Sequence, residues 1–295
     1  MKIEIQPSKE IIEKWIRDYV PEKDIFFLPE KNLKSIDGYL QNALVIPREE
    51  FFQHKSYNQI QLANSYESWN ISLEAEYVIV APPDWVNSLP SKTKAQLFHI
   101  QKEMGRGLIY PVLDLSIEAS FFKDYIIEVD EAYFLILQRA MWDELSFTLK
   151  ENLIKAFAQE WEDWTCYAFP EKAPLYLKKF ANSFPSAAGS NCLSTVLFSI
   201  TEQEWMIYEW IHPQTFIQKL IQANYSLTSS QECKAGDVVT WEDKEGVIQH
   251  ASYHIGSNLF FNKNGQTFFN PWKIVDFNEF KDQWNKYRLR VYRKM

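Results

Sequence analysis

The chain has 295 residues, of which 46% are hydrophobic and 24% charged, and its formal net charge at pH 7 is −8. Its Lys and Arg residues form no cluster, which excludes the basic face of a nucleic-acid-binding protein. No stretch approaches the roughly 18 consecutive apolar residues of a membrane helix, and no apolar signal segment follows Met1. Together with three cysteines that lack metal-ligand spacing, these features predict a reduced, cytoplasmic protein.

Residues 1–125 are predicted to form an α/β domain. Apolar residues recur at helical spacing over 8–20, and a second helix is expected over 91–104. The second helix follows a buried strand within 74–82 and precedes a strand over 108–113. Strand-helix-strand order is typical of an α/β unit.

Residues 126–183 are predicted to form a helical connector. Apolar residues between Leu135 and Trp161 recur at the spacing of one or two amphipathic helices. Three acidic residues of this segment are interpreted as a solvated face: Glu160, Glu162 and Asp163.

Residues 184–295 predict an α+β module. A helix is expected to start at Cys192, capped by Ser190 or Asn191. Further helix is expected over 202–211 and 214–223, and short strands over 237–241, 247–255, 259–262 and 288–293. Helices followed by an antiparallel meander are typical of this class.

Cys192 is the candidate nucleophile. A thiol reacts as its thiolate, and an ordinary thiol pKa of about 8.5 leaves little thiolate at pH 7. The unpaired N–H groups and the positive dipole end at a helix start favour the thiolate. The same N–H groups can bind the oxyanion of a tetrahedral intermediate.

His250 is the candidate base, and Asn262 is the candidate residue that orients it. His250, Ser252 and His254 alternate along one strand and share one face, so His254 is a rival base. Asn262 lies on the next strand, where its side-chain oxygen can accept the ring N–H and fix the tautomer. A strand-borne histidine facing a helix-borne thiol is the arrangement of papain-like enzymes.

Four segments carry a resemblance to the NlpC-type cysteine peptidases, over roughly residues 184–295. In chain order they are Asn191-Cys192-Leu193, Gly236-Asp237-Val238-Val239-Thr240-Trp241, His250-Ala251-Ser252-Tyr253-His254-Ile255-Gly256 and Leu259-Phe260-Phe261-Asn262. The resemblance implies a papain-like domain in which Cys192, His250 and Asn262 are nucleophile, base and third polar residue. It implies hydrolysis of an amide or ester, or acyl transfer, through an acyl-enzyme and without a metal or organic cofactor.

The chain departs from the family at the residue before the nucleophile. Family members usually carry an Asp there, which helps to bind the free amine of a cell-wall peptide, whereas this chain has Asn191. Asn191 and Ser190 are predicted to contact the substrate, a small peptide or acyl compound outside the usual specificity. The sequence leaves open the oligomeric state and the role of residues 1–125.

The alternative function is a non-catalytic binding or interaction protein that retains an NlpC-like fold. Thiol reactivity distinguishes the two, because a catalytic Cys192 should be alkylated at pH 7 faster than the other two cysteines. Cys166 and Cys233 are interpreted as structural, and His54, His99 and His212 have no cysteine or acidic partner at a useful spacing.

Overall fold

The computed structural model describes residues 1–112, 122–230 and 232–295. It is a mixed structure of 39% helix and 24% strand with antiparallel sheets, so the coarse helix-and-strand class is confirmed. The chain divides into two compact units, one of residues 1–15 and 155–295 and the other of residues 16–154.

The N-terminus belongs to the C-terminal unit. Strand β1 (Lys2–Glu4) pairs with β8 (Thr165–Tyr167), and helix α1 (Lys9–Asp18) confirms the helix predicted over 8–20. Trp15 of α1 is fully buried and contacts the rings of Phe184, Phe268 and Phe269. Burial of this large apolar ring attaches the N-terminal segment to the C-terminal unit. The two units therefore do not have the borders predicted after residues 125 and 183.

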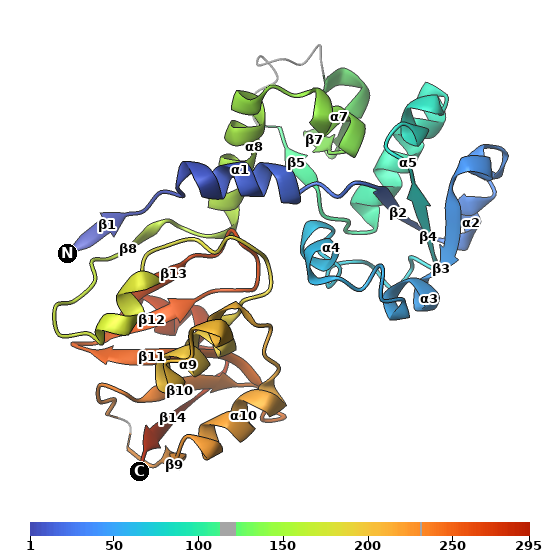
Figure 1. Cartoon of the computed structure of the whole chain (residues 1–295). Coiled ribbons are helices and arrows are strands. Elements are labelled where there is room, and N and C mark those ends of the chain that lie inside the picture. Colours follow the sequence, from blue (N-terminus) through green and yellow to red (C-terminus); the bar gives the residue numbers. More distant parts are fainter. Residues whose placement is uncertain (113–121, 231) are drawn as a thin grey trace. The chain divides into compact units, whose positions relative to one another are not determined.

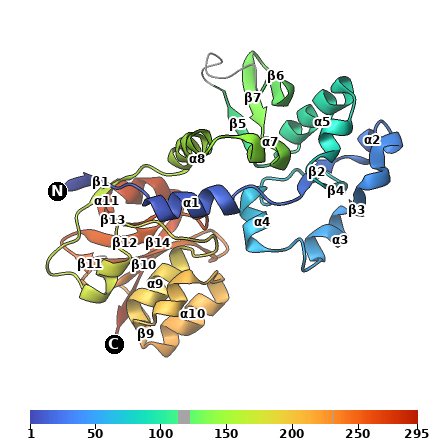
Figure 2. The same ribbon diagram turned by 45° about the horizontal axis from the view of Figure 1, so that its top comes forward.

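The described part of residues 16–154 contains two three-stranded antiparallel sheets (Figures 1 and 2). The first has the order β2-β4-β3, with β2 Asp24–Leu28, β3 Leu44–Pro47 and β4 Tyr77–Ala81. The second has the order β5-β7-β6, with β5 Ile109–Pro111, β6 Ile126–Val129 and β7 Ala132–Ile136. The α-helices described in this unit are α2 Glu30–Leu33, α3 Arg48–Gln53, α4 Ile60–Ser65, α5 Ser91–Glu103 and α7 Arg139–Glu144. Its 3-10 helices are η1 Asp37–Asn42, η2 Trp85–Ser88 and η3 Lys123–Tyr125.

The α/β unit predicted in the first 125 residues does not form. Strand β4, helix α5 and strand β5 lie where the sequence predicts them, but β4 and β5 belong to different sheets. The reason is that β4 is a central strand, whose two edges are already paired with β2 and β3. A parallel β4–β5 pair would need one of those edges.

The helical connector predicted over 126–183 is wrong in its first part. Residues 126–136 form the hairpin β6–β7, and the two-residue turn Asp130-Glu131 has positive φ angles of 51° and 64° at both positions. Such a turn usually contains Asn or Gly, so the acidic pair gave no hairpin signal. Within 126–183, α-helix is formed by α7 and by α8 (Phe147–Trp161), which leads from one unit into the other, and a 3-10 helix follows later in this range.

The C-terminal unit is built on a six-stranded antiparallel sheet of order β13-β12-β11-β10-β14-β9 (Figure 1). The strands predicted from the sequence are confirmed as β10 Val238–Glu242, β11 Ile248–Gly256, β12 Leu259–Lys263 and β14 Arg288–Lys294. Two further strands, β9 Tyr225–Thr228 and β13 Trp272–Asp276, complete the sheet. Helices α9 (Cys192–Thr201) and α10 (Pro213–Gln222) confirm two predicted helices, and the stretch 202–211 contains the 3-10 helix η5 (Glu204–Tyr208).

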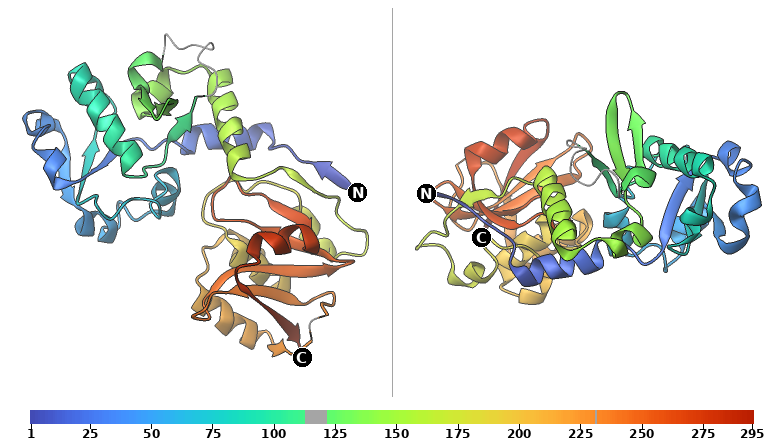
Figure 3. Two further views of the ribbon diagram at one scale, coloured as in Figure 1. Left: turned by 180° about the vertical axis from the view of Figure 1, so that it is seen from behind. Right: turned by 90° about the horizontal axis from the view of Figure 1, so that it is seen from above.

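The two faces of this sheet are covered by different elements (Figure 3). Helices α9 and α10 pack on one face, where Leu193 and Phe216 join a buried cluster with Ala251 and Phe261 of the sheet. Helix α11 (Phe277–Lys281) and the 3-10 helix η6 (Asp282–Trp284) lie on the other face, beside Trp241 and Phe260. The remaining 3-10 helix, η4, spans Leu175–Lys179. Within the described ranges, no helix is long and apolar enough to cross a membrane.

Candidate functional site

Cys192 is the first residue of α9, as the sequence predicts. Asn191 is the N-cap, since its Oδ1 accepts a hydrogen bond from the Ser194 backbone N–H at 3.0 Å, while Ser194 Oγ accepts the Asn191 N–H at 3.0 Å. This reciprocal capping box fixes where the helix begins. It leaves the N–H groups of Cys192 and Leu193, at the first turn, directed at the thiol.

The thiol of Cys192 is protonated in this structure at neutral pH. Burial raises its pKa to about 11, although hydrogen bonds from the backbone N–H groups of Ala251 and Leu193 and the charge of Lys263 act in the opposite direction. Desolvation disfavours the thiolate more strongly than these donors favour it. Activation of the thiol therefore requires a base that takes its proton.

His250 and Asn262 are hydrogen-bonded to each other. The ring Nε2 of His250 lies 2.8 Å from Oδ1 of Asn262, across the hairpin of β11 and β12. The ring stacks on Trp284 with centroids 4.2 Å apart and planes 5° from parallel. Burial lowers the His250 pKa to about 4, so the imidazole is neutral at pH 7.

The thiol lies beside the peptide bond that joins His250 to Ala251. Strands β11 and β12 are paired only as far as Tyr253 and Phe261, although both continue beyond that point. The Ala251 N–H is thus available to the Cys192 sulfur. The predicted hydrogen bond between this sulfur and the His250 ring is not formed among the described residues. The ring contacts Trp241, Phe280 and Trp284, on the face of the sheet opposite α9, whereas Cys192 packs with Ala251 on the α9 face.

Lys263 is a fully buried amine next to Asn262 that the sequence did not single out. Its Nζ donates to the backbone carbonyls of Thr267 at 2.9 Å and Gly265 at 3.3 Å. Burial lowers its pKa to about 7, whereas the charges of Glu162 and Cys192 favour the protonated form. Its place on β12 gave no sequence signal, because a lysine at a strand end is ordinarily solvated.

Glu162 is also buried, which contradicts the interpretation of its acidic segment as a solvated face. Its carboxylate pairs with Lys273 at 2.5 Å and accepts hydrogen bonds from Asn264 at 3.1 Å and Asn270 at 3.5 Å. Glu160 is exposed as expected. The sequence does not show that Glu160 and Glu162 differ in burial, because α8 ends at Trp161, between the two residues.

The two residues before the nucleophile have different environments. Asn191 uses both polar atoms within the protein, since its Nδ2 also donates to the Ile211 carbonyl at 2.8 Å. Ser190 is buried, and within the described part of the chain its hydroxyl has no hydrogen-bond partner. Contact of either residue with substrate stays a prediction. Of the two, only Ser190 has a side-chain group, its hydroxyl, that is not already hydrogen-bonded within the described part of the chain.

The rival residues are held elsewhere. His254 stacks on Phe260 with centroids 4.6 Å apart, and the charge near it is Asp237. Cys166 is buried in β8 with a thiol pKa raised by burial to about 11, and burial also raises the pKa of Cys233. In the described ranges, no group of three or more His, Cys, Asp or Glu residues has the arrangement of a metal site.

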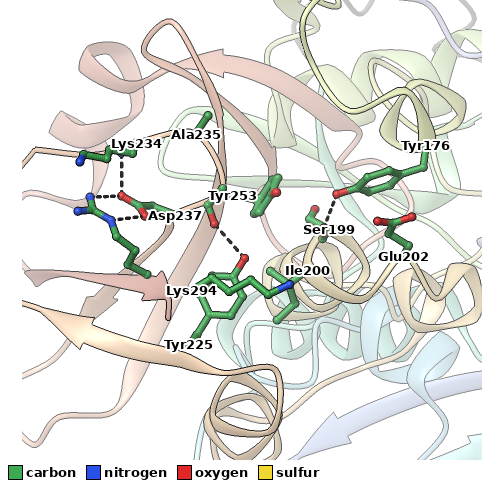
Figure 4. Close-up of a pocket in the computed structure, with 12 residues that line it drawn as sticks. Tyr176, Ser199, Ile200, Glu202, Tyr225, Lys234, Ala235, Asp237, Tyr253 and Lys294 are labelled. Carbon is green, nitrogen blue, oxygen red and sulfur yellow. Dashed lines mark hydrogen bonds and ion pairs between the residues drawn. The ribbon is translucent and has the colours of Figure 1, made fainter.

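A pocket of about 410 Å³ lies at the C-terminal end of α9, away from Cys192 (Figure 4). Its lining residues are Tyr176, Ser199, Ile200, Glu202, Tyr225, Lys234, Ala235, Gly236, Asp237, Tyr253, Arg293 and Lys294. Two of the charged side chains that line it, Arg293 and Asp237, pair with each other at 2.6 Å, and Tyr176 donates a hydrogen bond to the Ser199 carbonyl. None of the three predicted catalytic residues lines this pocket.

No family model matches the chain, and neither a curated protein nor a solved structure matches it. The assignment of a function therefore depends on the site itself.

Proposed function

We propose that the C-terminal unit is an NlpC-like cysteine hydrolase that cleaves an amide or ester through an acyl-enzyme on Cys192. The observation that carries the proposal is the 2.8 Å hydrogen bond between His250 Nε2 and Asn262 Oδ1, on a strand whose Ala251 N–H reaches the thiol of a cysteine that opens a helix. A neutral imidazole that donates from Nε2 keeps its lone pair on Nδ1. The Nδ1 atom is then the one that can accept the thiol proton.

The reaction proceeds in two acyl-transfer steps. The thiol proton moves to His250 Nδ1 as the sulfur attacks the substrate carbonyl, and the oxyanion forms near the N–H groups of Cys192 and Leu193. The histidine returns the proton to the leaving amine or alcohol, which yields a thioester. Water then attacks the thioester with the same histidine as base and releases the acid.

On this proposal, proton transfer from the thiol to the imidazole takes place in the substrate complex. In the free protein the thiol pKa is about 11 and the imidazole pKa is about 4, so the neutral pair is strongly favoured. The oxyanion hole and the helix dipole act on charge that develops only as the carbonyl is attacked. Slow alkylation of free Cys192 at pH 7 is therefore compatible with catalysis, contrary to the simple reactivity criterion drawn from the sequence.

The substrate class is a small peptide or acyl compound without a required free amine. Asn191 offers no carboxylate to pair with an ammonium group, and its amide is committed to the helix cap and to the Ile211 carbonyl. Ser190 supplies the unpartnered hydroxyl next to the nucleophile.

A non-catalytic binding protein of the same fold is the second candidate function. It is favoured by one observation, the burial that makes the thiol a weaker acid and the imidazole a weaker base than in solution. In such a protein the His250–Asn262 pair would serve only to satisfy two buried polar groups.

Acyl-enzyme trapping tests the proposal. The protein is incubated with an activated acyl ester, quenched in acid and mapped by mass spectrometry for an acyl group on each cysteine. We expect stoichiometric acylation of Cys192 in the wild type and in Cys233→Ala, and none in Cys192→Ala. His250→Gln should slow acylation by about 10²-fold or more, as expected when a general base is lost. Equal labelling of Cys192 in wild type and His250→Gln would support the binding protein instead.

A further inference from the structure

A continuous chain of side-chain hydrogen bonds connects Glu162 to His250. Glu162 Oε1 accepts from Asn264 Nδ2 at 3.1 Å, and Asn264 Oδ1 accepts from Asn262 Nδ2 at 3.0 Å. Asn262 Oδ1 in turn lies 2.8 Å from His250 Nε2. Apart from the partly exposed Asn264, the members of this chain are buried.

The direction of every bond in this chain is set at its carboxylate end. An ionised carboxylate only accepts hydrogen bonds, so Asn264 must present its NH₂ group to Glu162 and its oxygen to Asn262. Asn262 must then present its NH₂ group to Asn264 and its oxygen to His250. The oxygen can only accept, which leaves the imidazole with its hydrogen on Nε2.

The carboxylate is held in the acceptor state by its other contacts. Lys273 Nζ lies 2.5 Å from Glu162 Oε1 and also donates to the Asp163 carbonyl at 2.6 Å. Asn270 Nδ2 approaches Oε2 at 3.5 Å. All of these contacts come from N–H donors, so both carboxylate oxygens act as acceptors.

We propose that Glu162 is a positioning residue that sets the tautomer of His250 through Asn264 and Asn262, and thereby keeps Nδ1 free to act as the base. The catalytic role of this tautomer rests on the proposed function, whereas the hydrogen-bond chain that sets the tautomer does not. Glu162 follows α8 and lies outside residues 184–295, the region that carries the family resemblance. The site would thus depend on a residue from a segment that the resemblance does not cover.

A purely structural role for Glu162 makes a different prediction. In that case the carboxylate serves to neutralise Lys273, and its removal lowers stability without changing the protons on His250. The tautomer itself is therefore the deciding readout.

The test uses the full chain labelled with ¹⁵N-histidine, in which nuclear magnetic resonance distinguishes a protonated from an unprotonated ring nitrogen. His250→Gln assigns the His250 signals among the five histidines. Asn264→Ala interrupts the chain while leaving the Glu162–Lys273 pair intact, and Glu162→Gln removes the carboxylate. Glu160→Gln, on the exposed neighbour, is the matched control.

We expect wild type and Glu160→Gln to hold the hydrogen almost wholly on Nε2. In Asn264→Ala and Glu162→Gln, the ratio of the Nε2–H to the Nδ1–H form should fall about tenfold, the effect of losing one directing hydrogen bond. An unchanged ratio in folded Asn264→Ala overturns the inference, even where Glu162→Gln does not fold. The spectra need no substrate, so an inactive protein with a shifted ratio would refute the proposed hydrolase and leave the relay standing.

Discussion

The low pKa of His250 makes the stability of the C-terminal unit depend on pH in a calculable way. The folded-state pKa is about 4, against an ordinary value of 6.5. Because the unfolded chain binds the proton more readily, acidification favours unfolding. The stabilising contribution is fully present above pH 6.5 and is lost as the pH falls toward 4.

The magnitude follows from the shift of about 2.5 pKa units, which corresponds to about 3 kcal/mol in total. Between pH 7 and about pH 5 the difference in proton binding amounts to about 2 kcal/mol of unfolding free energy. Solvent screening does not reduce this value, because the side chain is only 1% exposed.

The assay is urea unfolding of the wild type and His250→Gln at several pH values between 4.5 and 7.5, followed by circular dichroism. The two units are expected to give separate transitions, and the comparison uses the one that the variant shifts. We expect the free-energy difference between the two proteins to shrink by about 2 kcal/mol from pH 7 to about pH 5. All other titrating groups, including His254, are common to both proteins and largely cancel. Parallel curves would show that His250 titrates normally and that its burial is not what the structure indicates.

Three further perturbations test the surroundings of the site. Trp284→Ala removes the ring stacked on His250, and admission of water should raise the His250 pKa toward 6.5, as followed by its ring proton shifts. Lys263→Met removes a charge that lowers the Cys192 pKa, so the midpoint of the pH dependence of Cys192 alkylation should rise; a constant midpoint would place Lys263 outside the field of the sulfur. Asn191→Asp retains the capping oxygen but loses the hydrogen bond to the Ile211 carbonyl, and should lower the free energy of unfolding by about 1 kcal/mol. The same variant should hydrolyse a substrate with a free amino terminus better, relative to its acylated counterpart, than wild type does; no change in that ratio would exclude Asn191 from the amine subsite.

Local sequence signals predicted most elements of the C-terminal unit. Strands β10, β11 and β12 alternate or run apolar between clear turns, and the turn before β12 contains Gly256, Ser257 and Asn258, all with positive φ. The start of α9 was predictable because Asn191 is a strong capping residue. Each of these signals acts within a few residues of the element that it specifies.

The missed elements depend on partners that are distant in sequence. Strand β1 is only three residues long and exists because it pairs with β8. Strand β13 is an exception, because it pairs with β12, the strand just before it in the chain, and begins directly after Pro271. The burial of Glu162 likewise depends on Lys273 and Asn264, more than a hundred residues away in the chain. Tertiary pairing decides such positions more than local propensity does.

The buried charges around Cys192 bear on the stability of the C-terminal unit and on the pKa of the thiol. Glu162 and Lys273 neutralise each other at 2.5 Å, whereas the described hydrogen bonds of the Lys263 ammonium go to two neutral carbonyls. A protonated Lys263 is therefore a buried cation whose charge no carboxylate at hydrogen-bond distance balances, and such a charge is costly unless an anion compensates it. Two anions favour this charge electrostatically, the Glu162 carboxylate more strongly and the Cys192 thiolate second. Replacement of Lys263 by an apolar residue is therefore expected to stabilise this unit and to raise the pKa of the Cys192 thiol further.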